Sequence, residues 1–332
     1  MSNRTKMDRI EVNQSDTNMI LTVTPDPVLD KIYFIDEWLS SSVMHAHKTI
    51  LSVGGKGLDS SVALSHLHQE SIALCFLAGE TGKQLSSLVN QYGIQSKPTW
   101  VDGETRCATI IAEQKHQRHT HLFSGGISVS DKHLEQFTQQ FHQELENTEW
   151  IITGGIFPAS LPQDFFVMLI QLAHQAGVKV LIDSHSQYIK PTLSEKPDVL
   201  KMNWKEFEWT FDAHSNSIEE LILQAEQVYR QSPMESLVIT CGAQGILAFT
   251  PAGIFHAIPP TLQVVNAAGA GDAASAALVW RLNQGEAWSE ALRWAGAVSA
   301  AVVLTEGTAD LHYRDVQDLL PEITLNEIPR KK

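Results

Sequence analysis

The stretch NAAGAGD, Asn266–Asp272, stands between a strand-like run, Leu262–Val265, and an alanine-rich run that extends to Leu278. This order predicts a strand, a tight glycine turn and a helix. Small residues let the backbone approach a ligand closely, and the free N–H groups at the start of a helix favour an anion. We therefore expect the turn to bind an anionic group and Asp272 to act beside it as a general base. An ordinary glycine turn with a carboxylate that suits the helix dipole is the alternative.

Apolar runs of β type alternate with segments of helical period from about residue 19 onward. This order and spacing favour an α/β domain in which a mostly parallel sheet is covered on both faces. We predict a flexible extension over residues 1–18 and a single domain over residues 19–325. The expected strands are Met19–Thr24, Ser71–Leu77, Trp150–Thr153, Val178–Ile182, Val199–Met202 and Leu237–Cys241. The expected helices are Ser60–His68, Lys83–Tyr92, Asp164–Ala176, Ser217–Arg230, Asp272–Leu282, Ala287–Leu304 and Val316–Leu320.

Two stretches interrupt this alternation, residues 31–53 and 98–123. Each contains short strands without a helix between them. In an α/β chain such segments often form a small sheet that stands off the main domain. We therefore expect a lid made of β-strands.

The 332 residues carry a formal net charge of −14. This charge argues against nucleic acid and anionic membrane surfaces as partners, because both attract proteins rich in Lys and Arg. Cys75, Cys107 and Cys241 form no C-x-x-C pair, so neither a disulfide framework nor a cysteine zinc site is indicated. A cytoplasmic location is expected. The N-terminal residues lack the apolar core of a signal peptide, and no apolar run reaches membrane-spanning length.

A second glycine-rich stretch, VGGKGLDSS at Val53–Ser61, opens a predicted helix. Its glycines and Lys56 suit the close approach of a polar ligand, while a tight turn with a solvated lysine is the alternative. The spacing is not that of a P-loop. Gly269, Gly271 and Ala274 also fit the dinucleotide pattern G-x-G-x-x-A. No strand follows that helix, which disfavours a nicotinamide oxidoreductase.

Two further strand ends carry polar residues. LKMNWKE at Leu200–Glu206 places Asn203 and Glu206 three residues apart, on one side of a first helical turn. They are either a capping pair or residues that orient magnesium-bound water near nucleotide phosphates. ITCGAQG at Ile239–Gly245 is either a plain hairpin or a loop that touches phosphates through Thr240 and its backbone amides.

Together these segments resemble the ribokinase-like carbohydrate kinases, the phosphofructokinase B-type superfamily, and most of all its 1-phosphofructokinase and tagatose-6-phosphate kinase branch. The resemblance extends from about Met19 to about Leu320. The family's motifs are T-x-N-P-x-x-D, G-G-K-G-x-N, T-R, K-P-N-x-x-E, S/T-x-G-x-x-G and G-A-G-D. They resemble, in this order, Thr24–Asp30, Gly54–Asp59, Thr105-Arg106, Lys201–Glu206, Thr240–Gly245 and Gly269–Asp272.

The resemblance implies an α/β, ribokinase-like three-layer fold with a β-sheet lid. It also implies an ATP-dependent kinase that phosphorylates a hydroxyl of a sugar or sugar phosphate, with ATP and Mg²⁺ as cofactors. Because small sheets with open edges need cover, and relatives often pair this way, a homodimer joined through the lid is expected.

The resemblance also assigns roles to residues. Asp272 would accept the proton of the attacking hydroxyl, while the amides of Gly269, Ala270 and Gly271 stabilise the transferring phosphoryl group. The implied acceptor-binding residues are Asp30, Gly55, Lys56, Asp59 and Arg106. The implied nucleotide-binding residues are Lys201, Asn203, Glu206, Thr240, Gly242 and Gly245, with Asn203 and Glu206 holding the metal through water.

Four positions depart from the family's pattern. Asp26 and Asp59 replace Asn, Ile156 replaces a Ser, and Val43-Met44-His45 stands where some members supply a basic residue from the lid. A carboxylate accepts hydrogen bonds only and repels a phosphate. We therefore expect an acceptor pocket that has shifted towards an unphosphorylated sugar or polyol, whereas Lys56 and Arg106 favour a sugar phosphate. A non-catalytic sugar- or nucleotide-binding protein and a kinase of another acceptor, such as a nucleoside, are the alternatives.

Overall fold

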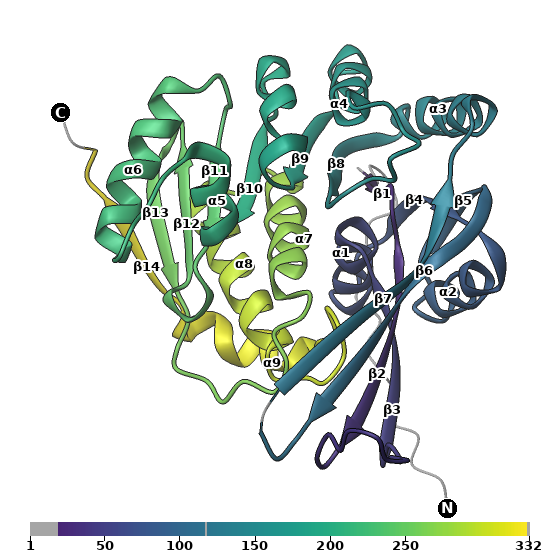
Figure 1. The fold of residues 1–332 in the computed structure, drawn as a ribbon. Coiled ribbons are helices and arrows are strands. Elements are labelled where there is room, and N and C mark those ends of the chain that lie inside the picture. Colours follow the sequence, from purple (N-terminus) through teal and green to yellow (C-terminus); the bar gives the residue numbers. More distant parts are fainter. Residues whose placement is uncertain (1–18, 117, 331–332) are drawn as a thin grey trace, which may run out of the picture.

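A ten-stranded sheet forms the centre of the molecule (Figure 1). The computed structural model describes residues 19–116 and 118–330, so the predicted extension over residues 1–18 lies outside the described residues. Neighbouring strands run parallel from β5 to β11 and antiparallel from β11 to β14, which confirms a mostly parallel sheet. In spatial order the strands are β14 (Thr324–Ile328), β13 (Gly253–Ile258), β12 (Ile246–Thr250), β11 (Leu237–Thr240), β10 (Val199–Asn203), β9 (Lys179–Asp183), β8 (Thr148–Gly154), β1 (Met19–Thr24), β4 (Ser71–Leu77) and β5 (Gln95–Trp100).

Helices cover both faces of this sheet, which confirms the three-layer architecture (Figure 1). One face packs against α1 (Lys56–His66), α2 (Gly79–Gln91), α7 (Ala270–Asn283), α8 (Trp288–Val302) and α9 (Tyr313–Leu319). The other face packs against α3 (Asp131–Leu145), α4 (Phe165–Gln175), α5 (Trp204–Phe211) and α6 (Ile218–Gln231). Among the described helices, none combines the length and apolar character that a membrane span needs.

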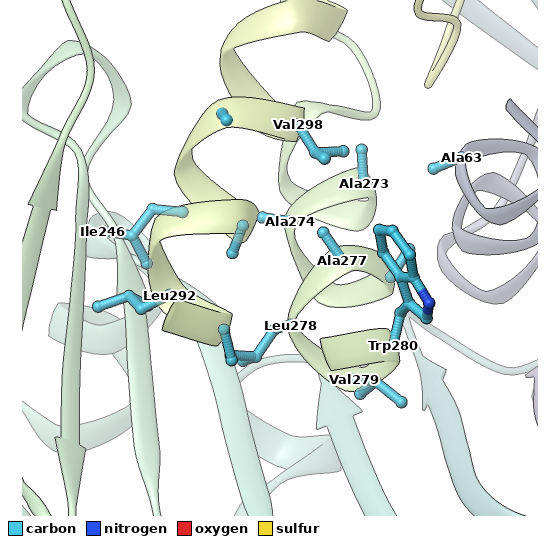
Figure 2. Close-up of a cluster of buried hydrophobic side chains, with 14 of the residues drawn as sticks. Ala63, Ile246, Ala273, Ala274, Ala277, Leu278, Val279, Trp280, Leu292 and Val298 are labelled. Carbon is cyan, nitrogen blue, oxygen red and sulfur yellow. The ribbon is translucent and has the colours of Figure 1, made fainter. Parts of the chain in front are cut away.

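The core on the first face is rich in alanine where α7 meets its neighbouring helices (Figure 2). Ala273, Ala274 and Ala277 of α7 are buried between α1 and α8. Because interaxial distance depends on side-chain size, alanine allows the three helices to pack closely. The first turn of α7 is thereby held in place from two sides.

A four-stranded sheet stands off the core as a lid, in the order β3-β2-β6-β7 (Figure 1). The strands are β2 (Val28–Ile35), β3 (Lys48–Gly54), β6 (Asp102–Glu113) and β7 (Arg118–Ser128). The lid strands start earlier than the expected segment 31–53, end later than the expected segment 98–123, and leave Pro98–Trp100 to β5 of the main sheet.

The lid contacts the core through the loop that follows α8. Lys48 of β3 forms an ion pair with Glu306, and Ser52 Oγ accepts a hydrogen bond from Thr308 N at 3.1 Å. Apolar side chains of the lid, including Ile32 and Ile110, line a small cavity between the lid and this loop. The loop from residue 304 to 310 therefore joins the lid to the layer that contains α7.

The expected strand Leu262–Val265 is not present. This segment runs beside the end of α8, where Val265 N donates to Val303 O at 2.8 Å. An apolar run forms a strand only where a neighbouring strand can satisfy its backbone groups, and here a helix end lies alongside instead.

The helix α1 also begins earlier than predicted, at Lys56 instead of Ser60, because Gly55 supplies its N-cap at φ 114°.

Candidate active site

Four neighbouring parallel strands end at the same edge of the main sheet. The strand register places Gly154 beside Asp183, Asp183 beside Lys201, and Asn203 beside Thr240. In α/β sheets, ligands bind in the crevice outside the carboxyl ends of the strands. The sequence-predicted residues Lys201, Asn203 and Thr240 therefore do lie together, and Asp183 lies among them.

The glycine turn before α7 brings the predicted base to this edge. Gly269 is the N-cap residue with φ 77°, and a Cβ atom there would lie 2.3 Å from Ala309 N. Only glycine fits this contact, so the tight approach between the turn and Ala309 fixes where α7 begins. Asp272 is in the first helical turn, next to the unpaired N–H groups of the helix start.

The carboxyl of Asp272 has an unusual environment for its charge. Burial raises its pKa to about 6, the Lys56 cation acts in the opposite direction, and the Asp183 carboxylate adds to the rise. Ser60 Oγ of α1 donates to the backbone oxygen of Asp272 at 3.1 Å, which ties the two helix starts together. Asp272 is ionised at neutral pH and can accept a proton.

Sequence reasoning missed Asp183, the most highly connected carboxylate of the site. Its Oδ1 lies 2.6 Å from Lys56 Nζ and its Oδ2 lies 2.5 Å from Lys201 Nζ. Burial opposes ionisation of Asp183, but the two lysines outweigh it and its pKa is lowered. The only sequence signal was its place at the end of an expected strand, where polar residues gather in parallel sheets.

Lys56 is oriented towards these carboxylates. Besides Asp183, its Nζ lies 3.6 Å from Glu206 Oε1. Burial would lower the pKa of Lys56, but the carboxylates of Asp183, Asp272 and Glu206 outweigh it, so the pKa is raised. Lys56 therefore carries a fixed positive charge beside the predicted base.

Asn203 and Glu206 form the capping box of α5. Asn203 Oδ1 accepts from Glu206 N at 2.9 Å, and Glu206 Oε2 accepts from Asn203 N at 2.8 Å. This box leaves Glu206 Oε1 to face Lys56. The capping explanation of this pair is thus correct, and the second carboxylate oxygen stays available for a further role.

These residues fit a hydrated magnesium ion. In the described parts of the chain, no group of three or more His, Cys, Asp or Glu side chains is placed to hold a metal directly. Mg²⁺ usually keeps several waters and binds through one or two carboxylates together with substrate phosphates. Glu206 Oε1 can contact such a water, which is the indirect role predicted for this residue.

A cavity of about 400 Å³ lies beside the glycine turn. Its lining combines polar side chains and glycine-turn backbone with apolar side chains: Asn203, Thr240, Gly242, Gly245, Ala270 and Gly271 on the one hand, and Pro259, Pro260, Leu262, Val264, Ala300 and Val303 on the other. A ligand that joins a flat apolar group to a chain of anionic groups matches this mixed lining. Lys201 is not among the lining residues, because its head is buried under the turn on Asp183.

The predicted acceptor residues come from the lid and from the start of α1. Asp30 of β2 is buried and its Oδ2 accepts from Thr308 Oγ1 at 3.2 Å. Burial raises the pKa of Asp30 to about 6. Asp59 Oδ2 accepts from Gly55 N at 3.1 Å. The carboxyls of Asp30, Asp59 and Asp272 interact electrostatically, so the structure brings these three together.

Arg106 is held by one of the residues that depart from the family's pattern. Its Nη1 lies 2.8 Å from Asp26 Oδ2, and its guanidinium lies 5.0 Å from the centre of the Phe123 ring. Ile156, another departure, has an exposed fraction of 37%. The replacement of Asn by Asp26 thus supplies a partner for the lid arginine.

The molecule combines a parallel sheet that has a ligand-sized cavity at its carboxyl edge, a buried aspartate at a helix start, and a β-sheet lid. This combination is typical of kinases that act on small molecules. The family model described as pfkB family carbohydrate kinase matches residues 26–313. The chain belongs to this family and is a carbohydrate kinase. Kinases of the family use ATP.

Known proteins similar to the chain support this assignment along more than nine tenths of its length. A 1-phosphofructokinase of Bacillus subtilis is 27% identical over 93% of this chain and 100% of its own. A tagatose-6-phosphate kinase of Staphylococcus epidermidis is 26% identical, with the same coverage. A structure of a phosphofructokinase-2 mutant from Escherichia coli superimposes with a TM-score of 0.85 at 19% identity, covering 92% of this chain and 99% of that one. The fold is therefore the ribokinase-like α/β fold.

Proposed function

We propose that the chain transfers the γ-phosphoryl group of MgATP to a hydroxyl of a hexose monophosphate that binds under the lid. The observation that carries this proposal is the position of Asp272. It lies in the first turn of α7, directly after Ala270 and Gly271, which line the cavity at the glycine turn, and both its carboxyl and that of the lid residue Asp30 interact with Asp59. A base at the boundary of two binding regions is what direct transfer between two ligands requires.

The residues of the site have different roles in this proposal. Asp272 removes the proton of the attacking hydroxyl, and Asp30 orients the acceptor from the lid. The N–H group of Gly271, at the start of α7, faces charge that develops on the phosphoryl group, whereas the N–H of Ala270 donates to Ala267 O at 3.3 Å. Lys56, held on Asp183, adds a positive charge on the same side.

The nucleotide occupies the cavity beside the glycine turn in this proposal. The adenine lies between the apolar walls, and the phosphates lie along Thr240 and Gly242 towards Gly271. Asn203 and Glu206 would hold Mg²⁺ through water, and the ion would supply positive charge against the phosphates. This donor set of amide and carboxylate oxygens suits a hard cation.

A neutral sugar is the second candidate acceptor, and one contact favours it. The ion pair with Asp26 compensates the charge of Arg106, which lowers the attraction of the lid for a phosphate. The names of the relatives favour the hexose monophosphate, because a 1-phosphofructokinase and a tagatose-6-phosphate kinase align along their full lengths.

The test is ATP consumption by the purified full chain with Mg²⁺ across a panel of acceptors. Fructose 1-phosphate and tagatose 6-phosphate represent the first candidate, fructose and tagatose the second, and adenosine a nucleoside. We expect the highest kcat/KM with a hexose monophosphate. A higher kcat/KM with an unphosphorylated sugar would contradict the hexose monophosphate and favour the neutral sugar as acceptor. No turnover with any acceptor would contradict both candidate functions.

We also propose that two copies pair through the outer face and edges of the lid. Large apolar side chains are exposed there, with exposed fractions of 87% for Val43, 67% for Leu122 and 49% for Leu51. Within residues 19–116 and 118–330, the edge strands β3 and β7 have no partner strand on one side. An exposed apolar face beside an open edge is stabilised when a second copy covers it.

A further inference from the structure

Asp59 is buried in a setting that does not suit an ionised carboxylate. Its exposed fraction is 5%, and it lies in the first turn of α1. Its Oδ2 accepts one hydrogen bond, from Gly55 N. Its Oδ1 is fully buried and has no hydrogen-bond partner among residues 19–116 and 118–330. A charged oxygen without a donor is costly to bury, more so than a protonated one.

The charges around Asp59 also disfavour its ionised form. The carboxyls of Asp30 on β2 and Asp272 on α7 face it, and so does the Lys56 cation from its own helix. Lys56 is engaged by Asp183 and Glu206, and no ion pair within the described ranges includes Asp59. The remaining titratable neighbour is Tyr92 after α2, a neutral hydroxyl at physiological pH.

These surroundings shift the proton affinity of Asp59 strongly. Burial raises the pKa of Asp59 well above its ordinary range, and the carboxylates of Asp272 and Asp30 raise it further. The Gly55 N–H and the Lys56 cation act in the opposite direction and do not cancel the rise. This direction agrees with the buried Oδ1, which has no donor among the described residues, and both favour the protonated form of Asp59.

We infer that Asp59 is a neutral carboxylic acid in the working enzyme, with its proton on Oδ1. Oδ2 accepts the Gly55 N–H, so Oδ1 is the oxygen free to hold the proton. A protonated carboxyl offers one donor and one acceptor, as does the amide of the Asn that the family's motif has here. Asp59 thus replaces that Asn without adding a charge, contrary to the expectation that it repels an anionic acceptor.

Protonation of Asp59 lets its neighbours ionise. Two carboxylates, Asp30 and Asp272, then face the acceptor and the phosphoryl group, and a third negative charge is avoided. Loss of the proton at alkaline pH adds that charge and weakens the binding of a hexose monophosphate. Asp59 therefore acts on the acceptor through the charge of the site and is a positioning residue. Its effect on the acceptor rests on the proposed function, whereas its protonation does not.

The first test measures the stability of the ligand-free full chain as a function of pH. Because the pKa of Asp59 is higher in the folded protein than in the unfolded chain, its stabilising contribution is full below the ordinary aspartate pKa. It is lost as pH rises towards the folded pKa. Asn cannot titrate, so the Tm of Asp59→Asn minus the Tm of the wild type should grow by a few degrees from about pH 4 to about pH 9.

The matched control is Asp131→Asn, which changes an exposed carboxyl in the first turn of α3. Its Tm difference from the wild type should not follow this trend with pH. A pH-independent difference for Asp59→Asn would overturn the inference.

The second test does not need the variant to fold. Wild-type protein labelled with carbon-13 at the aspartate carboxyls should show, near pH 7, one buried carboxyl that is still protonated. Asp30 and Asp272, with pKa values raised to about 6, are mostly ionised at that pH and do not account for it. A spectrum in which every aspartate carboxyl has lost its proton by pH 7 would contradict the inference.

The third test separates this inference from the proposed function. The KM of the wild type for a hexose monophosphate should rise at alkaline pH, and the KM of Asp59→Asn should stay level. If the chain shows no kinase activity, the proposed function fails while the stability and carbon-13 results still decide the state of Asp59. If turnover is present and the KM values of both proteins change equally with pH, Asp59 does not set acceptor binding.

Discussion

Lys56 Nζ lies 2.6 Å from Asp183 Oδ1, although one residue starts the first helix and the other ends a strand of the central sheet. The second oxygen of Asp183 binds Lys201, so one carboxylate fixes two cations. Exposed ion pairs of this length contribute little to stability, but Asp183 is only 2% exposed. Its partners are therefore fixed in place, and Lys56 presents its charge to Asp272 without having to be ordered by a ligand.

Lys201→Met should destabilise the protein strongly. It removes one of the two cations that compensate the buried Asp183 and leaves that carboxylate with Lys56 alone. We expect the free energy of unfolding, measured in urea, to fall by about 3 kcal/mol, at the low end for breaking a buried pair. The control Lys83→Met breaks an exposed pair with Glu80 and should have no measurable effect. If Asp183→Asn in addition fails to recover part of the loss, the effect is not one of charge.

Asp272→Asn should lower kcat by about 10²–10⁴-fold, the usual contribution of a general base. The amide keeps the shape of the side chain, so the Tm and the affinity for the nucleotide should change little. Asp131→Asn, which removes an exposed carboxylate from a first helical turn, serves as the control and should retain full activity. Turnover of Asp272→Asn within a few-fold of the wild type would show that another group is the base.

The kcat should rise with pH through a value near 6. A base has to be ionised before it can accept a proton, and burial raises the pKa of Asp272 to about 6. Asp30 titrates in the same range, so the apparent value reports on both carboxyls and not on Asp272 alone. The measurement is kcat at saturating substrates from about pH 5 to about pH 8. A flat profile over this range would contradict the assigned environment of the base.

Gly269→Ala should unfold the turn before α7, and the chain offers a matched control. Gly269 and Gly285 share φ 77°, but a Cβ atom at Gly269 would meet Ala309 N at 2.3 Å, while one at Gly285 meets nothing within 4 Å. Gly285→Ala should therefore cost only the left-handed strain of about 1–2 kcal/mol. Gly269→Ala should cost clearly more and should also lower kcat. Equal losses of stability would mean that the approach of Ala309 does not constrain the turn.

Leu122→Asp should dissociate the proposed dimer. Light scattering at micromolar concentration should give twice the chain mass for the wild type and the chain mass for the variant. Leu223→Asp changes a comparably apolar side chain, 43% exposed on α6, and should leave the dimer intact. A monomeric wild type would remove this proposal and leave the kinase assignment unchanged.

Motif spacing predicted most residues of the candidate site, because glycine turns at the ends of parallel strands have a strong local signature. The glycine turn, the capping pair and the Thr240 loop all lie at one edge of the sheet. Asp183 and Thr308 could not be found in this way. Asp183 acquires its role from the register with Lys201, and Thr308 from a contact with Asp30 across 278 positions of sequence. Such partners depend on tertiary packing.

Strands were predicted with correct bounds where apolar residues form a clear run in the sequence. Both Met19–Thr24 and Ser71–Leu77 match β1 and β4 residue for residue. The apolar run Leu262–Val265 was wrongly expected to be a strand, because sequence alone cannot show that a helix end lies beside it. The edge strand Thr324–Ile328 was missed, since its pattern of mostly exposed residues gives no apolar period.

The loop that follows α8 has a consequence for protein engineering. Its residues contact β3 through Glu306, β2 through Thr308 and the turn before α7 through Ala309. The lid is thus not an exchangeable module bounded by its own four strands. A chimera that takes a relative's acceptor preference has to transplant residues 304–310 together with the lid strands, since otherwise the grafted sheet meets a foreign loop and Asp272 shifts with it.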